Sequence, residues 1–490
     1  MANKNKAQNA SISPHFPPVV AVLGHVDHGK TTLLDAIRKS NIATREIGGI
    51  TQGIGASSIE VMHDGKKQRI TFIDTPGHQT FSAMRSRGAQ VADIGLLIVS
   101  ATDGVMLQTR ESIAALTASK MPIIVVLTKV DLPDKNIEKV KQQLLKENIL
   151  LEGLGGDVPV IEVSAKTNKN VAELLDLILL VFEMHADMFA NRTKDAAFSG
   201  TIIESKLDQK VGSKATMIIK NGTMRVRDMV VAGDATGKIR GLVNTEKKQI
   251  QEASIGDAVE VVGFTSVPSV GSIVSLANAK EDSRFKIQDS RSQETASLMH
   301  HDENALSIIL VTDTIGSLEA IVTALPKEIV VLLKKTGDIT VSDVFLAKST
   351  KSILVGFNAR VQLDVVNLAK TEKILLKNYT IIYELLDELK DVMDGKALAL
   401  VEEIYGKAKV LASFPFEKTK VLGITVLEGR VAKGDRVRLI RGEEIIGESV
   451  VNSVRQGKNQ ISKIEQGKEG GIILSPLLDF TIGDMILCHR

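Results

Sequence analysis

Cysteine is almost absent from this sequence of 490 residues, with Cys488 as its single occurrence. One cysteine excludes an intrachain disulfide and any cysteine-rich zinc site, and it fits a reducing compartment. Tryptophan is missing and only three tyrosines occur, which argues against nucleic-acid binding by rows of stacked aromatic side chains. We therefore predict a cytoplasmic protein that folds without disulfides or structural metals.

The sequence also lacks a charge excess of either sign and any long hydrophobic run. Its 61 Lys and Arg residues nearly balance 59 Asp and Glu residues, for a net charge of +2, so a uniformly basic DNA-binding surface is excluded. The most apolar segments, 94–99, 122–127 and 174–182, are shorter than the roughly 18–20 residues that a membrane span needs. The first ten residues have no apolar centre, which predicts a disordered tail over 1–17 rather than a secretory signal. We expect neither a membrane nor DNA among the partners.

The first half of the chain alternates between short apolar runs and segments with helical spacing. Continuous apolar strands separated by amphipathic helices are typical of a parallel sheet covered on both faces, so we predict one α/β domain over 18–188. The expected strands are 19–23, 69–73, 94–99, 122–127 and 158–163, and the expected helices are 31–39, 109–119, 136–147 and 171–188.

The rest of the chain predicts a multidomain α/β plus β protein. Short strands broken by Gly and Asp indicate a β-barrel, and three strand–helix units indicate a small αβα domain. The segment Gly222–Val230 shares the pattern Gly-x5-Asp-x-Val with Gly429–Val437, which favours two related barrels. The predicted parts are a barrel (189–277), a linker (278–304), the αβα domain (305–378), a helix (379–403) that either packs on that domain or connects it onward, and a second barrel (404–490).

The strongest chemical signal is the motif G-x4-G-K-[ST] between the first strand and the first helix. In this context glycines let backbone N–H groups face phosphate oxygens, and the helix N-terminus favours the negative charge. Lys30 would reach the β and γ phosphates, and the Thr31 hydroxyl would bind Mg²⁺. The predicted phosphate loop consists of Gly24, His25, Val26, Asp27, His28, Gly29, Lys30 and Thr31.

A second loop, after the strand 69–73, carries a carboxylate and a glycine that suit a nucleotide switch. Asp74 at the strand end would hold Mg²⁺ through a water, and the Gly77 N–H would meet the γ-phosphate. Thr51, which follows Gly48-Gly49-Ile50, would complete the Mg²⁺ shell; the alternative is an idle threonine in a surface loop. The predicted switch residues are Asp74, Thr75, Pro76, Gly77 and His78.

Two further loops predict the choice of base. Asp131 would accept hydrogen bonds from guanine N1–H and the 2-amino group, which adenine does not offer. Backbone N–H groups at Ser164, Ala165 and Lys166 would meet the guanine oxygen, and the Lys129 stem would lie along the base. Thr128 precedes this pair at the end of its strand. We therefore predict GTP and Mg²⁺ as cofactors.

These five segments, taken in order, resemble a GTPase of the translation-factor class, and the chain from 18 to 490 resembles the bacterial translation initiation factor two family. The residues that carry the resemblance are GHVDHGKT at Gly24–Thr31, GGITQGI at Gly48–Ile54, and the long segment Ile70–Gln108, within which Ala83–Val91 is the most diagnostic stretch. The resemblance implies a GTPase domain, a β-barrel, a small αβα domain, a linking helix and a second barrel. We expect the protein to lack the long N-terminal extension common in that family.

The resemblance also implies roles for single residues. His78 matches the histidine that helps to place the attacking water, and Val26 and Ile50 match the apolar pair that screens it. Thr128 stands where the family usually has Asn, Gln79 where an acid is usual, and Leu107 where Pro is usual.

The last barrel is implied to bind the formylmethionyl end of initiator tRNA. Its candidate contacts are Arg436, Arg438 and Arg441 on one expected hairpin, which would touch phosphates, and Gly470 and Gly471 within GKEGGI. The alternative for the arginines is a solvated charged face. The aromatic that the family often has near Gly457, and its Cys near Gly470, are absent.

The expected function is that of a GTP-hydrolysing switch on the ribosome. It would promote binding of formylmethionyl initiator tRNA to the small subunit and then joining of the large subunit, in company with other initiation factors, and hydrolysis would release it. Away from the ribosome we expect a monomer. The alternatives are another ribosome-associated translational GTPase that delivers a different tRNA, a nucleotide-dependent binding module with negligible hydrolysis, and an ATP-using P-loop enzyme.

Overall fold

The computed structural model of the chain describes residues 16–38, 51–277, 306–393, 404–416, 419–441, 444–456, 459–476, 478 and 480–489. The chain divides into two compact units, residues 1–393 and 394–490, which are described separately. The predicted linker 278–304, residues 1–15 of the predicted tail and residues 394–403 of the predicted helix lie outside the described residues.

The first unit begins with a six-stranded sheet in the order β2-β3-β1-β4-β5-β6. All neighbours pair in parallel except β2 and β3, which form an antiparallel hairpin. The prediction of a wholly parallel sheet was therefore wrong at this edge. Strand β2 reads GASSIEVMH and is only partly buried, so it lacks the continuous apolar run that identified the other strands. The strands are β1 (Val19–Gly24), β2 (Gly55–His63), β3 (Lys66–Asp74), β4 (Ile94–Ser100), β5 (Ile123–Thr128) and β6 (Val160–Glu162).

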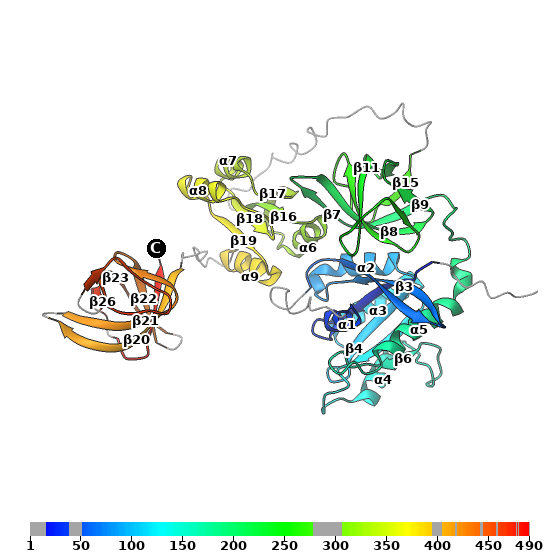
Figure 1. The fold of residues 1–490 in the computed structure, drawn as a ribbon, viewed down its shortest axis with the longest axis horizontal. Coiled ribbons are helices and arrows are strands. Elements are labelled where there is room, and N and C mark those ends of the chain that lie inside the picture. Colours follow the sequence, from blue (N-terminus) through cyan, green and yellow to red (C-terminus); the bar gives the residue numbers. More distant parts are fainter. Residues whose placement is uncertain are drawn as a thin grey trace, which may run out of the picture. The chain divides into compact units, whose positions relative to one another are not determined.

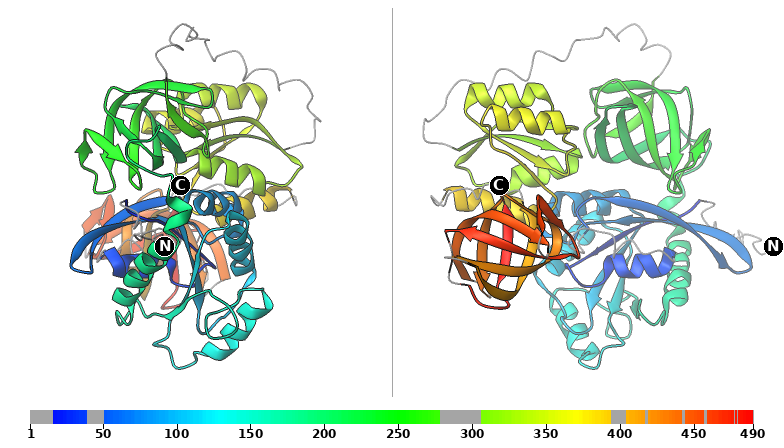
Figure 2. Two further views of the ribbon diagram at one scale, coloured as in Figure 1. Left: turned by 90° about the vertical axis from the view of Figure 1, so that its right-hand side faces the viewer. Right: turned by 60° about the vertical axis from the view of Figure 1, so that its left-hand side comes forward.

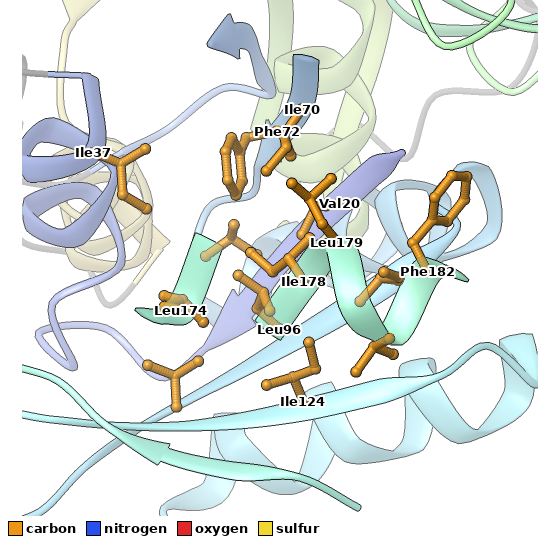
Figure 3. Close-up of a cluster of buried hydrophobic side chains, with 14 of the residues drawn as sticks. Val20, Ile37, Ile70, Phe72, Leu96, Ile124, Leu174, Ile178, Leu179 and Phe182 are labelled. Carbon is orange, nitrogen blue, oxygen red and sulfur yellow. The ribbon is translucent and has the colours of Figure 1, made fainter. Parts of the chain in front are cut away.

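Helices cover both faces of this sheet. The larger hydrophobic core lies between the sheet and the helices α1 and α5. In it Val20, Phe72 and Leu96 of the sheet meet Leu174 and Ile178 of α5 (Figure 3). Helix α2, with the sequence SAMRSRGAQV, has no clear apolar stripe and was missed by periodicity. The helices are α1 (Lys30–Arg38), α2 (Ser82–Val91), α3 (Leu107–Ser119), α4 (Ile137–Lys146) and α5 (Val171–Met184), with short 3-10 turns η2 (Gln79–Phe81) and η3 (Ala186–Phe189).

A closed barrel follows, drawn in green in Figure 2. Its strands form the ring β7-β8-β14-β11-β10-β15, which returns to β7. It is joined to the first domain through buried polar contacts: Lys220 Nζ lies 2.7 Å from Asp93 Oδ1, and Thr71 Oγ1 donates to the Gly256 carbonyl at 2.8 Å. The barrel strands are β7 (Ser199–Asp208), β8 (Gly212–Asn221), β9 (Thr223–Arg225), β10 (Met229–Ala232), β11 (Ala235–Asn244), β12 (Gln249–Ile250), β13 (Glu252–Ser254), β14 (Ala258–Phe264) and β15 (Ile273–Leu276).

The third part of this unit is a parallel four-stranded sheet, ordered β17-β16-β18-β19, between two pairs of helices (Figure 1). Helix α9 packs on its own domain through the buried side chains Ile382, Leu385 and Leu389. Tyr379, expected to begin that helix, belongs to the short strand β19, which was not predicted. The elements are β16 (Leu306–Thr312), β17 (Ile329–Thr336), β18 (Ile353–Phe357), β19 (Leu376–Tyr379), α6 (Ile315–Ala324), α7 (Val341–Thr350), α8 (Leu363–Thr371) and α9 (Ile382–Met393).

The second unit is another closed barrel, with the ring β20-β21-β26-β23-β22-β27. The predicted fold class, an α/β GTPase-type domain with two barrels and a small αβα sandwich, is confirmed, whereas the exact domain boundaries stay predictions. The strands are β20 (Ile404–Phe416), β21 (Thr419–Ala432), β22 (Arg436–Arg441), β23 (Glu444–Gln456), β24 (Asn459–Ile461), β25 (Lys463–Glu465), β26 (Glu469–Ser475) and β27 (Met485–His489). Among the described residues, no helix is long and apolar enough to cross a membrane.

Candidate nucleotide-binding site

The predicted phosphate loop connects strand β1 to helix α1. Gly24 is required there because a Cβ atom would lie 2.4 Å from the Ile98 carbonyl oxygen, and Gly29 adopts a φ of 85° that favours glycine. Lys30 is buried, and its Nζ donates to the carbonyls of Gly24 at 3.0 Å and His25 at 2.6 Å. Burial lowers the pKa of Lys30 to about 8. The result is an ammonium group inside the loop, at the N-terminus of a helix, where anions are favoured.

Two histidines of the same loop are neutral at pH 7. The rings of His25 and His28 meet edge to face with centroids 4.9 Å apart. His28 is fully buried, and this burial, together with the nearby His25, lowers its pKa to about 4. Burial also lowers the pKa of His25. The loop therefore gains no further positive charge from its histidines.

Oxygen donors that suit a magnesium ion lie together beside this loop. The hydroxyl oxygens of Thr31 and Thr51 are 2.7 Å apart, although they come from different segments. The Asp74 carboxylate is buried at the end of strand β3. Hydroxyl and carboxylate oxygens are hard donors of the kind Mg²⁺ prefers, so these three residues fit the predicted ion. Groups of three or more His, Cys, Asp or Glu side chains that could hold a metal are absent from the part of the chain that the structure describes.

The loop after Asp74 is held against the phosphate loop by a residue that sequence reasoning missed. A Cβ on Gly77 would lie 2.9 Å from the backbone nitrogen of Val26, so this close approach to the phosphate loop favours glycine. Arg85 is 1% exposed; its guanidinium donates to the carbonyls of Gly77 and His78 and forms an ion pair with Glu111. Arg85 lies in the stretch that carried the family resemblance, yet its inward direction was not evident from a helix without a clear apolar face.

His78 lies at the rim of a pocket beside the phosphate loop, where Thr80 fixes its side chain. Its Nδ1 accepts a hydrogen bond from the Thr80 backbone N–H at 3.2 Å and lies 2.7 Å from Thr80 Oγ1. Burial lowers the pKa of His78, and the positive charge of the nearby Arg85 lowers it further. The backbone N–H of Val26 donates to Gln108 Oε1 at 3.0 Å. The other expected member of the apolar pair, Ile50, lies outside the described residues.

The predicted base loops meet at the end of strand β5. Thr128 Oγ1 donates to the His28 carbonyl of the phosphate loop at 2.6 Å, so threonine at this position still ties the two loops together. Ser164 Oγ donates to Asp131 Oδ1 at 2.8 Å and thereby lowers the pKa of that carboxyl. Lys129 has a φ of 57°, and its ammonium lies 3.2 Å from Asp103.

Two pockets, of about 170 Å³ and 260 Å³, share Asp27, Gly29 and Thr32 and therefore adjoin. The first is lined by the phosphate loop, Thr51, Gly77 and His78, and the second by Thr128, Lys129, Asp131, Ala165 and Lys166. All five predicted segments thus converge on one connected space. Lining residues that sequence reasoning missed are Thr32, Phe81, Leu132 and Tyr383.

In the second unit, the arginines expected to contact tRNA are largely paired with acids. Arg441 contacts both carboxylate oxygens of Asp484 at 3.0 Å and lowers the pKa of that carboxyl to about 2. Arg438 Nε donates to Glu448 at 3.0 Å, whereas Arg436 is exposed. Their role in binding stays a prediction.

The two expected glycine contacts have a packing explanation. A Cβ on Gly470 would lie 2.4 Å from Ile464 Cδ1 and 2.8 Å from the Arg455 carbonyl oxygen, and one on Gly471 would lie 2.8 Å from Val421 Cγ1. Both positions therefore favour glycine without any ligand, and a role in tRNA binding stays a prediction.

Comparison with known proteins agrees with this geometry. Residues 18–184 match the elongation factor Tu GTP binding domain, residues 197–276 match elongation factor G domain 2, and residues 280–390 match translation-initiation factor 2. These matches indicate similarity to the GTP-binding class of translation factors.

Whole-chain relatives narrow the class. Translation initiation factor IF-2 of Aquifex aeolicus is 40% identical over 97% of this chain and 61% of its own length. The same factor of Carboxydothermus hydrogenoformans is 40% identical over 97% and 60%. The chain is therefore similar to translation initiation factor IF-2 over nearly its whole length, and it spans about three fifths of the length of these relatives.

A solved structure, GDP-bound aIF5B from Aeropyrum pernix, is 24% identical over 96% of this chain and 92% of that chain, with a TM-score of 0.46. A similarity at this level supports no conclusion about the arrangement of the domains.

Proposed function

We propose that this protein binds GTP with Mg²⁺ in the two adjoining pockets, hydrolyses it, and works as a cytoplasmic translation initiation factor on the ribosome. The observation that carries the proposal is the convergence of five separate loops on one connected space. A buried lysine and a helix N-terminus suit the phosphates at one end, and the exposed Asp131 carboxylate suits guanine at the other.

The residues divide the work between binding and hydrolysis. Lys30 and the backbone of the phosphate loop hold the triphosphate, while Asp131 and Ser164 select the base. Thr31, Thr51 and Asp74 would hold Mg²⁺, the last through a water, and the ion would neutralise phosphate charge when bound. Neutral His78 orients the attacking water, with Val26 of the predicted apolar pair beside the same pocket.

Similarity to translation initiation factor IF-2 supports the proposed partners. We propose that the factor promotes binding of formylmethionyl initiator tRNA to the small subunit, acts with other initiation factors, and leaves after the large subunit has joined and GTP has been hydrolysed. The second barrel is the proposed tRNA-binding part, with Arg436 as its most accessible candidate because Arg438 and Arg441 contact acids. Away from the ribosome, the chain is proposed to be a monomer.

Nucleotide titration tests the core of this proposal. Calorimetry with Mg²⁺ should detect GTP binding, and ATP should compete poorly. Asp131→Asn should weaken GTP binding by about a hundredfold or more and favour xanthosine triphosphate, because the carboxylate no longer meets two donors. Asp134→Asn, the same change at an exposed carboxylate three residues further on, is the matched control and should retain the preference for guanine. Equal binding of ATP and GTP would contradict the proposal.

A second experiment tests the tRNA. A filter-binding assay compares initiator tRNA carrying formylmethionine with the unformylated form and with an elongator aminoacyl-tRNA. The formylated form should be retained best. Equal retention of all three would favour a translational GTPase that delivers a different tRNA.

A further inference from the structure

One helix end from the αβα domain lies on the proposed nucleotide pocket. Tyr383, the second residue of α9 (Figure 1), lines this pocket together with Thr51, Gly77 and His78. Its neighbours Ile382 and Leu385 are buried in their own domain, so the aromatic ring is presented outward from a fixed helix. No local sequence pattern connects this residue to the phosphate loop.

The start of α9 is attached to the loop beside Thr51 by a paired hydrogen bond. Gln52 Nε2 donates to the Thr380 carbonyl at 2.8 Å, and Gln52 Oε1 accepts from the Ile382 N–H at 3.1 Å. Both ends of one amide thus join backbone groups 328 and 330 residues away in the sequence. Such a fork fixes both the distance and the angle between loop and helix.

The other side of the pocket is attached to the same domain by packing. Phe81 and Met84, which follow His78, are buried in one hydrophobic cluster with Ile382, Leu385 and Leu389 of α9. The loop that carries His78 and the helix that carries Tyr383 therefore share one core. A movement of either would disturb close-packed side chains, which interiors resist.

Between these two anchors, the ring of His78 is held on several sides. The Tyr383 ring meets it edge to face with centroids 4.3 Å apart and an interplanar angle of 75°, and Phe81 lies at 6.3 Å. On the imidazole itself, Nδ1 is engaged by Thr80. Edge-to-face aromatic contacts are favourable beyond simple burial, so this orientation of His78 is stabilised rather than incidental.

We propose that Tyr383 is a positioning residue that restrains His78 in a resting orientation, with Nδ1 bound to Thr80, and so keeps GTP hydrolysis slow until α9 moves. The inference rests on the proposed function, since it assigns a regulator to the same site. It makes α9 the element through which a partner that displaces the αβα domain would release the histidine. The Tyr383 ring restrains His78, and Gln52 and Phe81 keep α9 in the position from which that ring makes the contact.

The test measures GTP hydrolysis without ribosomes, separating kcat from KM. Tyr383→Ala should raise the basal kcat about two- to tenfold, the range that loss of one aromatic contact allows, with KM nearly unchanged. Tyr383→Phe keeps the ring and should stay close to the original rate. Asp387→Ala, at an exposed position of the same helix, is the matched control.

A double variant identifies the group that is released. His78→Ala combined with Tyr383→Ala should not show the rise, because the restrained imidazole is gone. A Tyr383→Ala protein that binds GTP normally, melts normally and hydrolyses at the original rate would overturn the inference alone. A chain that neither binds nor hydrolyses GTP would overturn the proposed function itself, and with it this inference.

Discussion

The two barrels of this protein share one design and differ in what surrounds it. Their strands form the same ring, with β7, β8, β14, β11, β10 and β15 corresponding in order to β20, β21, β26, β23, β22 and β27. The shared Gly-x5-Asp-x-Val turn is also built alike. Asp228 Oδ2 accepts from the Arg225 N–H at 2.7 Å, and Asp435 Oδ2 accepts from the Ala432 N–H at 2.8 Å.

The cores of the two barrels have exchanged a large and a small side chain. In the pairing of β9 with β13, Ala253 takes the position that Ile464 takes in the pairing of β21 with β25. In the pairing of β8 with β14, Val259 takes the position that Gly470 takes in the pairing of β21 with β26. Where the first barrel has alanine and valine, the second has isoleucine and glycine. Cores tolerate such exchanges when the total volume is conserved.

The surfaces differ more than the cores. Lys220, two residues before the turn glycine of the first barrel, is bonded to the buried Asp93; Leu427 holds the same place in the second barrel and is 44% exposed. The tight turn at Gly256 is buried against Thr71, whereas the matching turn at Gly467 is exposed. These surface residues distinguish the first barrel, which contacts its neighbouring domain, from the second.

The largest expected effect comes from removing the contact of Lys220 with Asp93, which the first barrel makes with its neighbouring domain. Lys220→Met removes a cation from Asp93, which also contacts Arg192, and should destabilise the first unit by about 3–5 kcal/mol because a buried charge loses a partner. Leu427→Met in the second barrel should change stability by less than about 0.5 kcal/mol. Calorimetric melting of both variants measures this. Equal shifts would mean that the contact with Asp93 contributes little.

A second prediction concerns the exchanged core pair. Gly470→Val should destabilise the second unit by about 2–3 kcal/mol, since its side chain would overlap Ile464 and the Arg455 carbonyl. Adding Ile464→Ala should restore part of the loss, because it removes the overlap with Ile464 and leaves the contact with the Arg455 carbonyl. Unfolding of the single and double variants, followed by circular dichroism, gives the coupling. Additive losses would show that the two positions do not share space.

A third prediction contrasts the pH dependence of the two units. Burial raises the pKa of Glu204, which accepts from the Gly316 N–H, to about 7. The protonated form is therefore favoured by folding, and this stability is present below about pH 4.5 and lost as pH rises through about 7. Asp484 gives the second unit the opposite pH dependence. The stability that its carboxylate contributes is present above about pH 4 and is lost as pH falls toward about 2.

Glu204→Gln should therefore remove a pH dependence of about 2.5 kcal/mol from the stability of the first unit between pH 5 and 8. Gln retains the acceptor for Gly316 and carries no charge, so the variant should be the more stable protein at pH 8. Melting of the second unit over the same range should not change. A first unit whose pH dependence survives the substitution would exclude Glu204 as its source.

The smallest expected effect tests the shared turn. Asp228→Ala and Asp435→Ala each remove a side-chain cap on a backbone N–H and should cost about 1 kcal/mol in their own units. If the turns are equivalent, the two losses should agree within about 0.5 kcal/mol by calorimetry. A clear inequality would indicate that the ion pair of Asp435 with Arg430 sets the second turn apart.

Periodicity predicted most elements of the fold, and its failures have physical reasons. The buried strands β1, β4 and β5 are continuous apolar runs, whereas the half-exposed β2 and the four-residue β19 give too weak a pattern. Helix α2 was missed because Arg85 and Met84 are buried within it beside exposed polar residues, so polarity along the chain does not follow burial.

The candidate site also contains residues that the sequence pattern predicted and residues that it did not. The segments Gly24–Thr31 and Asp74–His78, which contribute to one pocket, could be predicted as loops of one site because glycine, lysine and strand ends recur at fixed spacing. Arg85 and Gln108, which hold these loops in place, were not found as such, since their partners are backbone groups chosen by the fold.

The sequence by itself determined the fold class, the loops that line the two pockets and the repeated barrel turn, because each depends on backbone conformation or hydrophobic spacing within a short segment. Only the tertiary structure placed Tyr383 against His78, joined Gln52 to α9, and separated the buried barrel surface from the exposed one. Those contacts join residues distant along the chain, and packing alone decides which of them meet.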